Sequence, residues 1–202
     1  MVAGPGRTHM SVEEYLELDR KSSDARYEYA DGYAYLMSGG TPQHALIIGN
    51  FQGELNRRFE QRGSPCLSYP ADATVRLSET HYVHPDVVVT CDEQDLASTD
   101  VLRSPCLVVE VLSPSTERKD RSQKFDWYRA CPSIQDIVFV RTDLPLIEVY
   151  RRRSAERLWL LQIYGPGEEI ELISVNVQIP VDIVYRRVIF PSNGSNEGSQ
   201  QK

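Results

Sequence analysis

The sequence contains no long hydrophobic run, and this absence excludes an integral membrane helix. No apolar stretch approaches the roughly 18 residues that a membrane span requires. Residues 1–10 also lack the apolar stretch of a secretory signal. The sequence therefore predicts a protein with no membrane partner, and a cytoplasmic location follows by elimination.

Cysteine is scarce and shows no paired spacing. The only four cysteines are Cys66, Cys91, Cys106 and Cys131, and none forms a Cys-x-x-Cys motif. In an intracellular chain this spacing is typical of buried free thiols rather than of a zinc site or a disulfide framework. We therefore predict that all four are unbridged.

Positive charge is in deficit. The chain has 22 Lys and Arg against 29 Asp and Glu, a formal net charge of -7. Proteins that coat nucleic acid by long-range attraction are usually basic, so the charge counts against that class. A nuclease with a local basic patch and an acidic, metal-dependent centre remains compatible. Candidate phosphate contacts are the surface arginines, which are more often simply solvated: Arg57, Arg58, Arg62, Arg151, Arg152 and Arg153.

Length and composition indicate one globular domain. The 202 residues are 41% hydrophobic and 25% charged, which is ordinary for a folded chain with a substantial core. Gly and Pro in residues 1–9 predict a flexible N-terminus, and the polar, low-complexity residues 191–202 predict a disordered tail. The predicted domain is 10–190.

Local signals define an N-terminal helix and a hairpin. Ser11 followed by Glu14 forms a capping-box pattern, which predicts a helix start with Tyr15 on its apolar face. Two aromatic-rich runs then flank Asp31-Gly32, a dipeptide typical of tight β-hairpins.

Two longer helices are predicted. The first runs from Thr41-Pro42 to about Arg62 and ends at Gly63. Its expected apolar positions are Ala45, Ile48, Leu55 and Phe59. The second begins at Ser115 or Thr116 and extends to Ala130, before Pro132.

The remaining apolar segments read as strands. Short β-branched runs such as 86–90 (DVVVT) and 107–112 (LVVEVL) are typical of central strands covered on both faces. The segment 91–104 between them is acidic and polar, which predicts a surface excursion. A Gly-Pro-Gly turn at 165–167 predicts antiparallel pairing of the strands that flank it. The other predicted strands are 67–77, 137–140, 147–150, 159–163 and 170–177. Strands mixed with helices predict an α/β (α+β) fold.

Two carboxylates are placed where a metal site would form. Asp86 begins one apolar strand, and Glu110 lies near the end of the next. If these strands are antiparallel neighbours, both carboxylates meet at one edge of the sheet. Burying two like charges is unfavourable without a cation, and Mg²⁺ prefers hard oxygen ligands and needs only one or two carboxylates. The alternative is that Glu110 faces outward or pairs with an arginine.

The helix that follows carries the basic candidates. Lys124 is four residues from both Asp120 and Tyr128, so the three share a face. A lysine directed at the carboxylates could orient the attacking water and stabilise the charge of a phosphorane. The alternative is an ordinary solvated basic face.

Four motifs together resemble the Uma-two family, a large and mostly uncharacterised group of nuclease-like proteins in the PD-(D/E)XK superfamily. They are RYEYADGYAYLMSGGTPQHALIIGNF, HPDVVV, LVVEVLSPST and DRSQKFDWY, and the resemblance extends from about Met10 to Arg153. It implies a restriction-endonuclease-like mixed sheet with an αβββαβ core, to which this chain adds the N-terminal helix and hairpin and C-terminal antiparallel strands. The core elements would be the helix after Thr41, strands ending at Leu77, Thr90 and Leu112, the helix from Thr116 and the strand 137–140.

The resemblance also implies site residues. Pro85-Asp86 matches the PD element, Glu110 the acidic position of the third strand, and Val111 would offer its backbone carbonyl to Mg²⁺ or Mn²⁺. Leu112 stands where the motif lysine belongs, and Lys124 is the matching substitute from the next helix. Glu28 and His44 fall at further motif positions and are candidate cleft residues; relatives often have an acid where this chain has Gln43.

The leading functional hypothesis is a Mg²⁺-dependent endonuclease that hydrolyses DNA phosphodiester bonds, with Asp86, Glu110 and Lys124 as catalytic residues and a homodimer as a plausible assembly. A second hypothesis is a non-catalytic binding or regulatory module that keeps the nuclease fold. A third is hydrolysis of a small nucleotide or another phosphate ester, because a fold does not fix a substrate.

Overall fold

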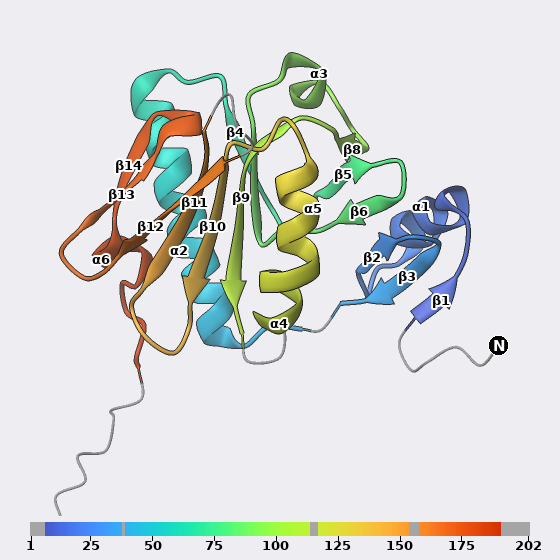
Figure 1. The fold of residues 1–202 in the computed structure, drawn as a ribbon, viewed down its shortest axis with the longest axis horizontal. Coiled ribbons are helices and arrows are strands. Elements are labelled where there is room, and N and C mark those ends of the chain that lie inside the picture. Colours follow the sequence, from blue (N-terminus) through green and yellow to red (C-terminus); the bar gives the residue numbers. More distant parts are fainter. Residues whose placement is uncertain (1–6, 38, 114–116, 154–157, 191–202) are drawn as a thin grey trace, which may run out of the picture.

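The computed structural model describes residues 7–37, 39–113, 117–153 and 158–190. Within these ranges the chain forms two six-stranded sheets and a two-stranded sheet, with helices packed against them (Figure 1). The predicted tail at 191–202 and the first six residues of the predicted N-terminal segment lie outside the described residues. The other three residues of that segment, expected to be loose, form strand β1 (Arg7–His9).

The central sheet has the order β12-β11-β10-β9-β7-β4. Strands β9 and β10 are parallel, and every other neighbouring pair in this sheet is antiparallel. The antiparallel pairing of β7 with β9 is the arrangement under which Asp86 and Glu110 were expected to meet. The strands are β4 (Leu67–Pro70), β7 (Val87–Thr90), β9 (Pro105–Leu112), β10 (Asp136–Arg141), β11 (Ile147–Arg153) and β12 (Leu158–Tyr164).

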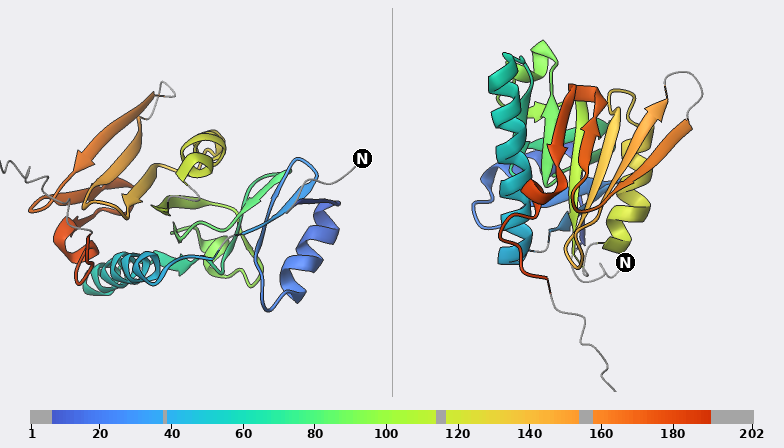
Figure 2. Two further views of the ribbon diagram at one scale, coloured as in Figure 1. Left: turned by 90° about the horizontal axis from the view of Figure 1, so that it is seen from below. Right: turned by 90° about the vertical axis from the view of Figure 1, so that its left-hand side faces the viewer.

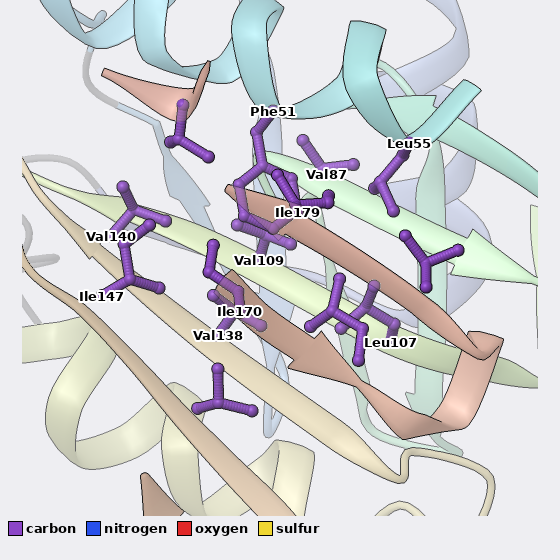
Figure 3. Packing of buried hydrophobic residues seen from close by; sticks show 14 of the residues in the cluster. Phe51, Leu55, Val87, Leu107, Val109, Val138, Val140, Ile147, Ile170 and Ile179 are labelled. Carbon is purple, nitrogen blue, oxygen red and sulfur yellow. The ribbon is translucent and has the colours of Figure 1, made fainter. Parts of the chain in front are cut away.

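Helix α2 (Pro42–Arg62) covers one face of this sheet and matches its predicted bounds. The Thr41 side chain accepts a hydrogen bond from the His44 amide at its start, and Gly63 ends it in the left-handed conformation, with φ of 60°. Its buried apolar side chains point at the strands, among them Phe51 and Leu55 opposite Val87 and Val109 (Figure 3). Two predicted apolar positions differ: Ala45 is exposed, and Ile48 is only half-buried.

Strand alternation divides the central sheet into two apolar layers. On β9, Leu107, Val109 and Val111 belong to the layer that α2 covers, whereas Val108 and Leu112 belong to the opposite layer. The second layer packs against the helix that follows β9. Glu110 therefore shares its face with Val108 and Leu112 and points toward that helix.

The helix after β9 consists of three consecutive parts, α4 (Glu117–Lys119), a π-helical turn η1 (Asp120–Lys124) and α5 (Phe125–Ala130). Its predicted first residues, 115 and 116, lie outside the described residues. Figure 2 shows α2 and α5 on opposite sides of the central sheet. Tyr128 of α5 is fully buried in the second layer. A π-turn inside a helix is frequently found at functional sites.

The second six-stranded sheet has the order β1-β3-β2-β6-β5-β8 and packs with α1 (Val12–Lys21). Ser11 and Glu14 form the predicted capping box of α1. Asp31 and Gly32, both with positive φ, form the predicted turn between β2 and β3. The strands are β2 (Tyr27–Ala30), β3 (Tyr33–Leu36), β5 (Thr74–Ser78), β6 (His81–Val83) and β8 (Val101–Leu102).

The single strand predicted at 67–77 is wrong. It is two strands in different sheets, β4 and β5, separated by a turn in which the amide of Ala73 donates to the carbonyl of Pro70. Proline has no amide hydrogen to continue a strand ladder, so the chain leaves the central sheet here. The first core strand therefore ends at Pro70 rather than at Leu77.

The segments after β7 and β12 show two further differences. The predicted surface excursion 91–104 contains the short helix α3 (Glu93–Leu96) and ends in the buried strand β8. After the turn at 165–167, β13 (Glu169–Leu172) does not pair with β12. It pairs with β14 (Val177–Pro180), beyond the 3₁₀ turn η2 (Ile173–Val175), and this small sheet covers the central core together with α6 (Val181–Val184).

The prediction of four free thiols is wrong. Cys66 and Cys91 form a disulfide, whereas Cys106 and Cys131 are free. The register of β4 with β7 pairs Leu67 with Thr90, which brings the two cysteines just beyond that pair together. Disulfides persist mainly in oxidising environments. The bond therefore gives no support to the predicted cytoplasmic location, which stays a prediction.

Across the described ranges, none of the helices combines the length and the apolar character that crossing a bilayer requires.

Candidate active site

Asp86 and Glu110 lie together at one edge of the central sheet. Val87 is paired with Val109 in the antiparallel register, so the preceding Asp86 and the following Glu110 occupy the next position of the ladder. The backbone amide of Val111 donates a hydrogen bond of 2.7 Å to Asp86 Oδ2. The convergence of the two carboxylates that the sequence predicted is therefore present in the fold.

Lys124 reaches the same position from the helix after β9. Its Nζ lies 2.6 Å from Glu110 Oε1, 2.9 Å from Glu28 Oε1 and 3.7 Å from Asp120 Oδ1. The lysine side chain is only 4% exposed. The ammonium group thus occupies the site although the motif position, Leu112, carries no charge.

The spacing of the helix explains this placement. Asp120, Lys124 and Tyr128 follow at intervals of four residues, and all three are buried on the face toward β9. The Tyr128 hydroxyl donates a hydrogen bond to Glu110 Oε1, the same oxygen that Lys124 contacts. One helix face therefore supplies a base, a cation and a neutral donor to the site.

Glu28 enters the site from β2 of the second sheet. It is 3% exposed and contacts two lysines, with Lys124 Nζ at its Oε1 and Lys119 Nζ 2.5 Å from its Oε2. Burial raises the pKa of Glu28, but the charges of Lys124 and Lys119 outweigh burial and lower it to about 2. Glu28 is consequently an ionised partner of both lysines.

His44 lies on the other side of Asp86, in the first turn of α2. Its Nε2 is 3.3 Å from Asp86 Oδ2. Burial lowers the pKa of His44, but hydrogen bonding to Asp86, the Asp86 charge and a hydrogen bond to the backbone of Val111 raise it overall. The neighbouring Gln43 is turned away, since its Nε2 donates to the Thr142 carbonyl at 3.0 Å.

Gly40 allows the ring of His44 to lie against the backbone. A Cβ added at Gly40 would lie 2.6 Å from His44 Nδ1, a separation that real side chains do not tolerate. At the neighbouring Gly39 no atom lies within 4 Å of such a Cβ. The glycine at position 40, but not that at position 39, is therefore required by a close approach.

The pKa of Glu110 is raised to about 8 even with the Lys124 ammonium beside it. Burial raises its pKa most strongly, and the like charges of Asp120 and Asp86 add to this, against the opposing effect of Lys124. Lys124 shows the reverse balance. Burial lowers its pKa, but Glu110 and Glu28 raise it well above the ordinary value, so Lys124 stays protonated.

These side chains surround a cavity of about 180 Å³. Its walls combine the acidic and basic groups above with Leu36 and Met37 of the β3 end, Gly39 and Gly40, and His84. The volume suits one phosphate group with a few waters rather than a nucleic acid duplex.

The donor set fits a hard divalent cation in part. Among the described residues no group of three or more His, Cys, Asp or Glu side chains is arranged to hold a metal. Two carboxylates are nevertheless adjacent, and Mg²⁺ usually keeps several waters and binds through only one or two carboxylates. Among the described residues, Asp86 is contacted at Oδ2 by the Val111 amide and His44, and Glu110 at Oε1 by Tyr128 and Lys124.

Most of the predicted phosphate contacts have structural partners instead. Arg57 and Arg58 pair with Glu54, and Arg62 donates to the Asn176 carbonyl. In β11, Arg151 pairs with Asp136, and Arg152 donates to the Ile134 and Cys131 carbonyls. None of these arginines lines the cavity.

Several residues in or beside the cavity were not predicted as site residues. Asp120 and Tyr128 carried a signal, namely their spacing from Lys124. His84 had a weaker one, since it directly precedes Pro85-Asp86. It is buried, with Nδ1 3.1 Å from the Ala71 carbonyl and Nε2 3.4 Å from Asp19 Oδ1. Lys119 could not be distinguished from the other basic residues of its helix.

The architecture belongs to the restriction-endonuclease-like class of nuclease folds. The crystal structure of a protein from Anabaena variabilis ATCC 29413, described as a putative nuclease belonging to DUF820, matches with a TM-score of 0.71. The match covers 89% of this chain and 99% of that one at 14% sequence identity, so it shows the fold alone.

Sequence comparison gives the family. The Uma2 family, described as "Putative restriction endonuclease", matches residues 12–182. The chain is also 36% identical over 182 residues to "Uncharacterized protein slr1290" of Synechocystis sp. (strain ATCC 27184 / PCC 6803 / Kazusa), covering 90% of this chain and 94% of that protein. A second protein of that organism, "Uncharacterized protein sll1609", is 26% identical over 166 residues, 80% of this chain and 92% of its own length. The chain therefore belongs to the Uma2 (Uma-two) family.

Proposed function

We propose that the protein is a Mg²⁺- or Mn²⁺-dependent endonuclease that hydrolyses DNA phosphodiester bonds. Asp86 and Glu110 would hold the cation, with the Val111 carbonyl as a further ligand, and Lys124 would act on the attacking water. Membership of a family described as "Putative restriction endonuclease" supports the reaction class. From this reaction class we infer that the substrate is DNA.

The observation that carries the proposal is the position of Lys124. Lysine is almost never fully buried unless it is paired, and one partner of this lysine, at 2.6 Å, is the proposed metal ligand Glu110. A helix thus supplies the ammonium group that the motif position in β9 lacks.

Charge balance in the cavity supports a divalent cation. The described lining includes four carboxylates (Glu28, Asp86, Glu110 and Asp120) and two ammonium groups (Lys119 and Lys124). When all four carboxylates are ionised they outnumber the ammonium groups by two, an excess that one divalent ion would neutralise. The ion would also bring an anionic phosphate to an acidic site.

The residues divide the chemistry between them. A bound Mg²⁺ would polarise a phosphoryl oxygen and lower the pKa of a bound water. Lys124 would orient the attacking water and stabilise charge that develops on the phosphate. Glu28 would keep Lys124 ionised and aimed at the cavity, and His44 would hold the Asp86 carboxylate through Oδ2.

The test is cleavage of supercoiled plasmid with Mn²⁺ by the wild type, Glu110→Ala and Lys124→Ala. We expect cleavage by the wild type, none by Glu110→Ala, and at least a hundredfold loss in Lys124→Ala with Mn²⁺ binding nearly intact. Lys21→Ala, which alters an exposed lysine, is the control. Cleavage by Glu110→Ala equal to that of the wild type would reject the assignment.

One observation favours a second function, a non-catalytic nuclease-fold module. The net charge is -7, and most of the candidate arginines have structural partners. This function predicts DNA or protein binding without cleavage under any metal. Hydrolysis of another phosphate ester would instead appear as metal-dependent release of phosphate or nucleotide with no plasmid nicking.

We also propose a cytoplasmic homodimer that pairs through the edge strand β12. Four large apolar side chains of this strand are exposed, namely Leu158, Leu160, Leu161 and Ile163. An unprotected apolar edge favours pairing with another strand. Light scattering should give twice the chain mass, and Leu161→Lys should give the monomer.

A further inference from the structure

Tyr128 places its hydroxyl group on a carboxylate of the candidate active site. The side chain is fully buried in α5, and its hydroxyl donates to Glu110 Oε1. Lys124 Nζ contacts the same oxygen at 2.6 Å. Two donors from one helix therefore converge on one oxygen of Glu110.

This arrangement fixes how Glu110 presents its other oxygen. Among the described residues, no donor contacts Glu110 Oε2. Asp86 shows the same division, since the Val111 amide and His44 Nε2 both contact Oδ2. Among the described residues, each carboxylate is therefore held through one of its two oxygens.

Other buried tyrosines show that this partner is not needed for burial alone. A buried tyrosine hydroxyl usually finds an acceptor. For Tyr15, Tyr29 and Tyr185 that acceptor is a backbone carbonyl, and the buried Tyr164 hydroxyl has none among the described residues. Tyr15 donates to the Tyr27 carbonyl at 2.9 Å, and Tyr185 donates to the Leu146 carbonyl at 2.8 Å. Tyr128 instead uses the carboxylate that lines the cavity.

We propose that Tyr128 is a positioning residue, which orients Glu110 so that Oε2 faces the divalent cation. The inference rests on the proposed metal-dependent function and assigns a part of that site to α5. Tyr128 itself does not touch the cavity, since it is absent from the described lining. It acts through Glu110.

The experiment is calorimetric titration of Mn²⁺ into the wild type, Tyr128→Phe and Tyr150→Phe. Loss of a hydrogen bond to a metal ligand typically weakens metal affinity 10- to 100-fold, and we expect Tyr128→Phe to fall in this range. Tyr150→Phe is the matched control, because its hydroxyl also donates to a glutamate, Glu148, outside the cavity. It should bind Mn²⁺ as the wild type does.

Plasmid cleavage adds a readout that a purely structural role would not change. In Tyr128→Phe the Mn²⁺ concentration for half-maximal cleavage should rise by the same factor, and the rate at saturating Mn²⁺ should approach that of the wild type. An unchanged Mn²⁺ dependence in a folded Tyr128→Phe overturns the inference and leaves the proposed function intact. A wild type that binds no Mn²⁺ overturns both.

A measurement on the wild type covers the case in which Tyr128→Phe does not fold. With ring-labelled tyrosine, the infrared difference spectrum between metal-free and Mn²⁺-saturated protein should contain a shifted tyrosine C–O band, because Glu110 Oε1 becomes a weaker acceptor when Oε2 binds the ion. Mn²⁺ binding with no tyrosine band in that spectrum would contradict the role of Tyr128.

Discussion

Glu28 and Lys124 meet at 2.9 Å between Oε1 and Nζ, although one lies on β2 of the second sheet and the other on the π-turn beside the central sheet. Both side chains are 4% exposed. The pair joins the two sheets at the candidate active site. An ion pair this deeply buried is favourable only while both partners are present.

Glu28→Ala should therefore destabilise the protein strongly. The substitution removes one of the carboxylates that contact the Lys124 ammonium. Breaking a buried ion pair typically costs about 3–5 kcal/mol of stability. Urea denaturation measures the change. The matched control is Glu17→Ala, which breaks the exposed pair with Lys21 and should cost about 0–1 kcal/mol. Equal effects of the two substitutions would show that the Glu28 pair is not specially stabilising.

Gly40→Ala should displace the His44 ring, because the new Cβ would lie 2.6 Å from Nδ1. The Asp86 carboxylate would then lose its contact with His44 Nε2, and we expect Mn²⁺ affinity to fall at least about tenfold, as for other groups that orient metal ligands. Calorimetry with Gly40→Ala and the neighbouring Gly39→Ala provides the comparison. Gly39→Ala adds its Cβ to open space, so this variant should bind Mn²⁺ as the wild type does. A similar loss of Mn²⁺ affinity in Gly39→Ala would mean that the loop backbone, and not His44, causes the loss in Gly40→Ala.

The disulfide should contribute measurably to stability. Cys66 and Cys91 close a loop with a sequence separation of 25 residues, for which chain entropy predicts about 3–4 kcal/mol. Cys66→Ser should lower the free energy of unfolding by about this amount in urea, and reductant should lower that of the wild type similarly. Cys131→Ser, at a free thiol, should not respond to reductant differently from the wild type. A wild type indifferent to reductant would contradict the bond.

The stability of the protein should depend on pH through Glu148. Burial raises the pKa of Glu148, but its hydrogen bonds from Arg121 outweigh this and hold it below 4.5. A lowered native pKa contributes stability above pH 4.5 that is lost as the pH falls through the native value. Glu148→Gln should therefore be less stable than the wild type at pH 7, and the gap should narrow as the pH falls below 4.5. A gap independent of pH would show that the charge of Glu148 is not the cause.

The order of elements and the acidic pair could be predicted because the necessary signals are local. Asp86 directly precedes the apolar strand β7 and Glu110 lies near the end of the apolar strand β9, and antiparallel pairing brings the start of one to the end of the other. Caps at Ser11, Thr41 and Gly63 marked helix ends by the same kind of local chemistry. These features need no knowledge of distant contacts.

Contacts between distant segments were harder to predict. Glu28 could be named only from a family resemblance, because nothing local shows that a hairpin of the second sheet reaches Lys124. The Cys66–Cys91 bond depends on the register of β4 with β7. That register could not be predicted, because residues 67–77 were expected to form one strand. Tyr128 had the right helical spacing, but its acceptor became evident only when β9 and α5 were placed against each other.

The central claim is that Asp86 and Glu110 share one divalent cation. Titration calorimetry of Mn²⁺ into the wild type, Asp86→Ala and Glu110→Ala tests it most directly. The account predicts one ion per chain in the wild type and loss of that site in both variants. Wild-type protein that binds no Mn²⁺, or variants that bind it as tightly as the wild type does, would contradict the claim.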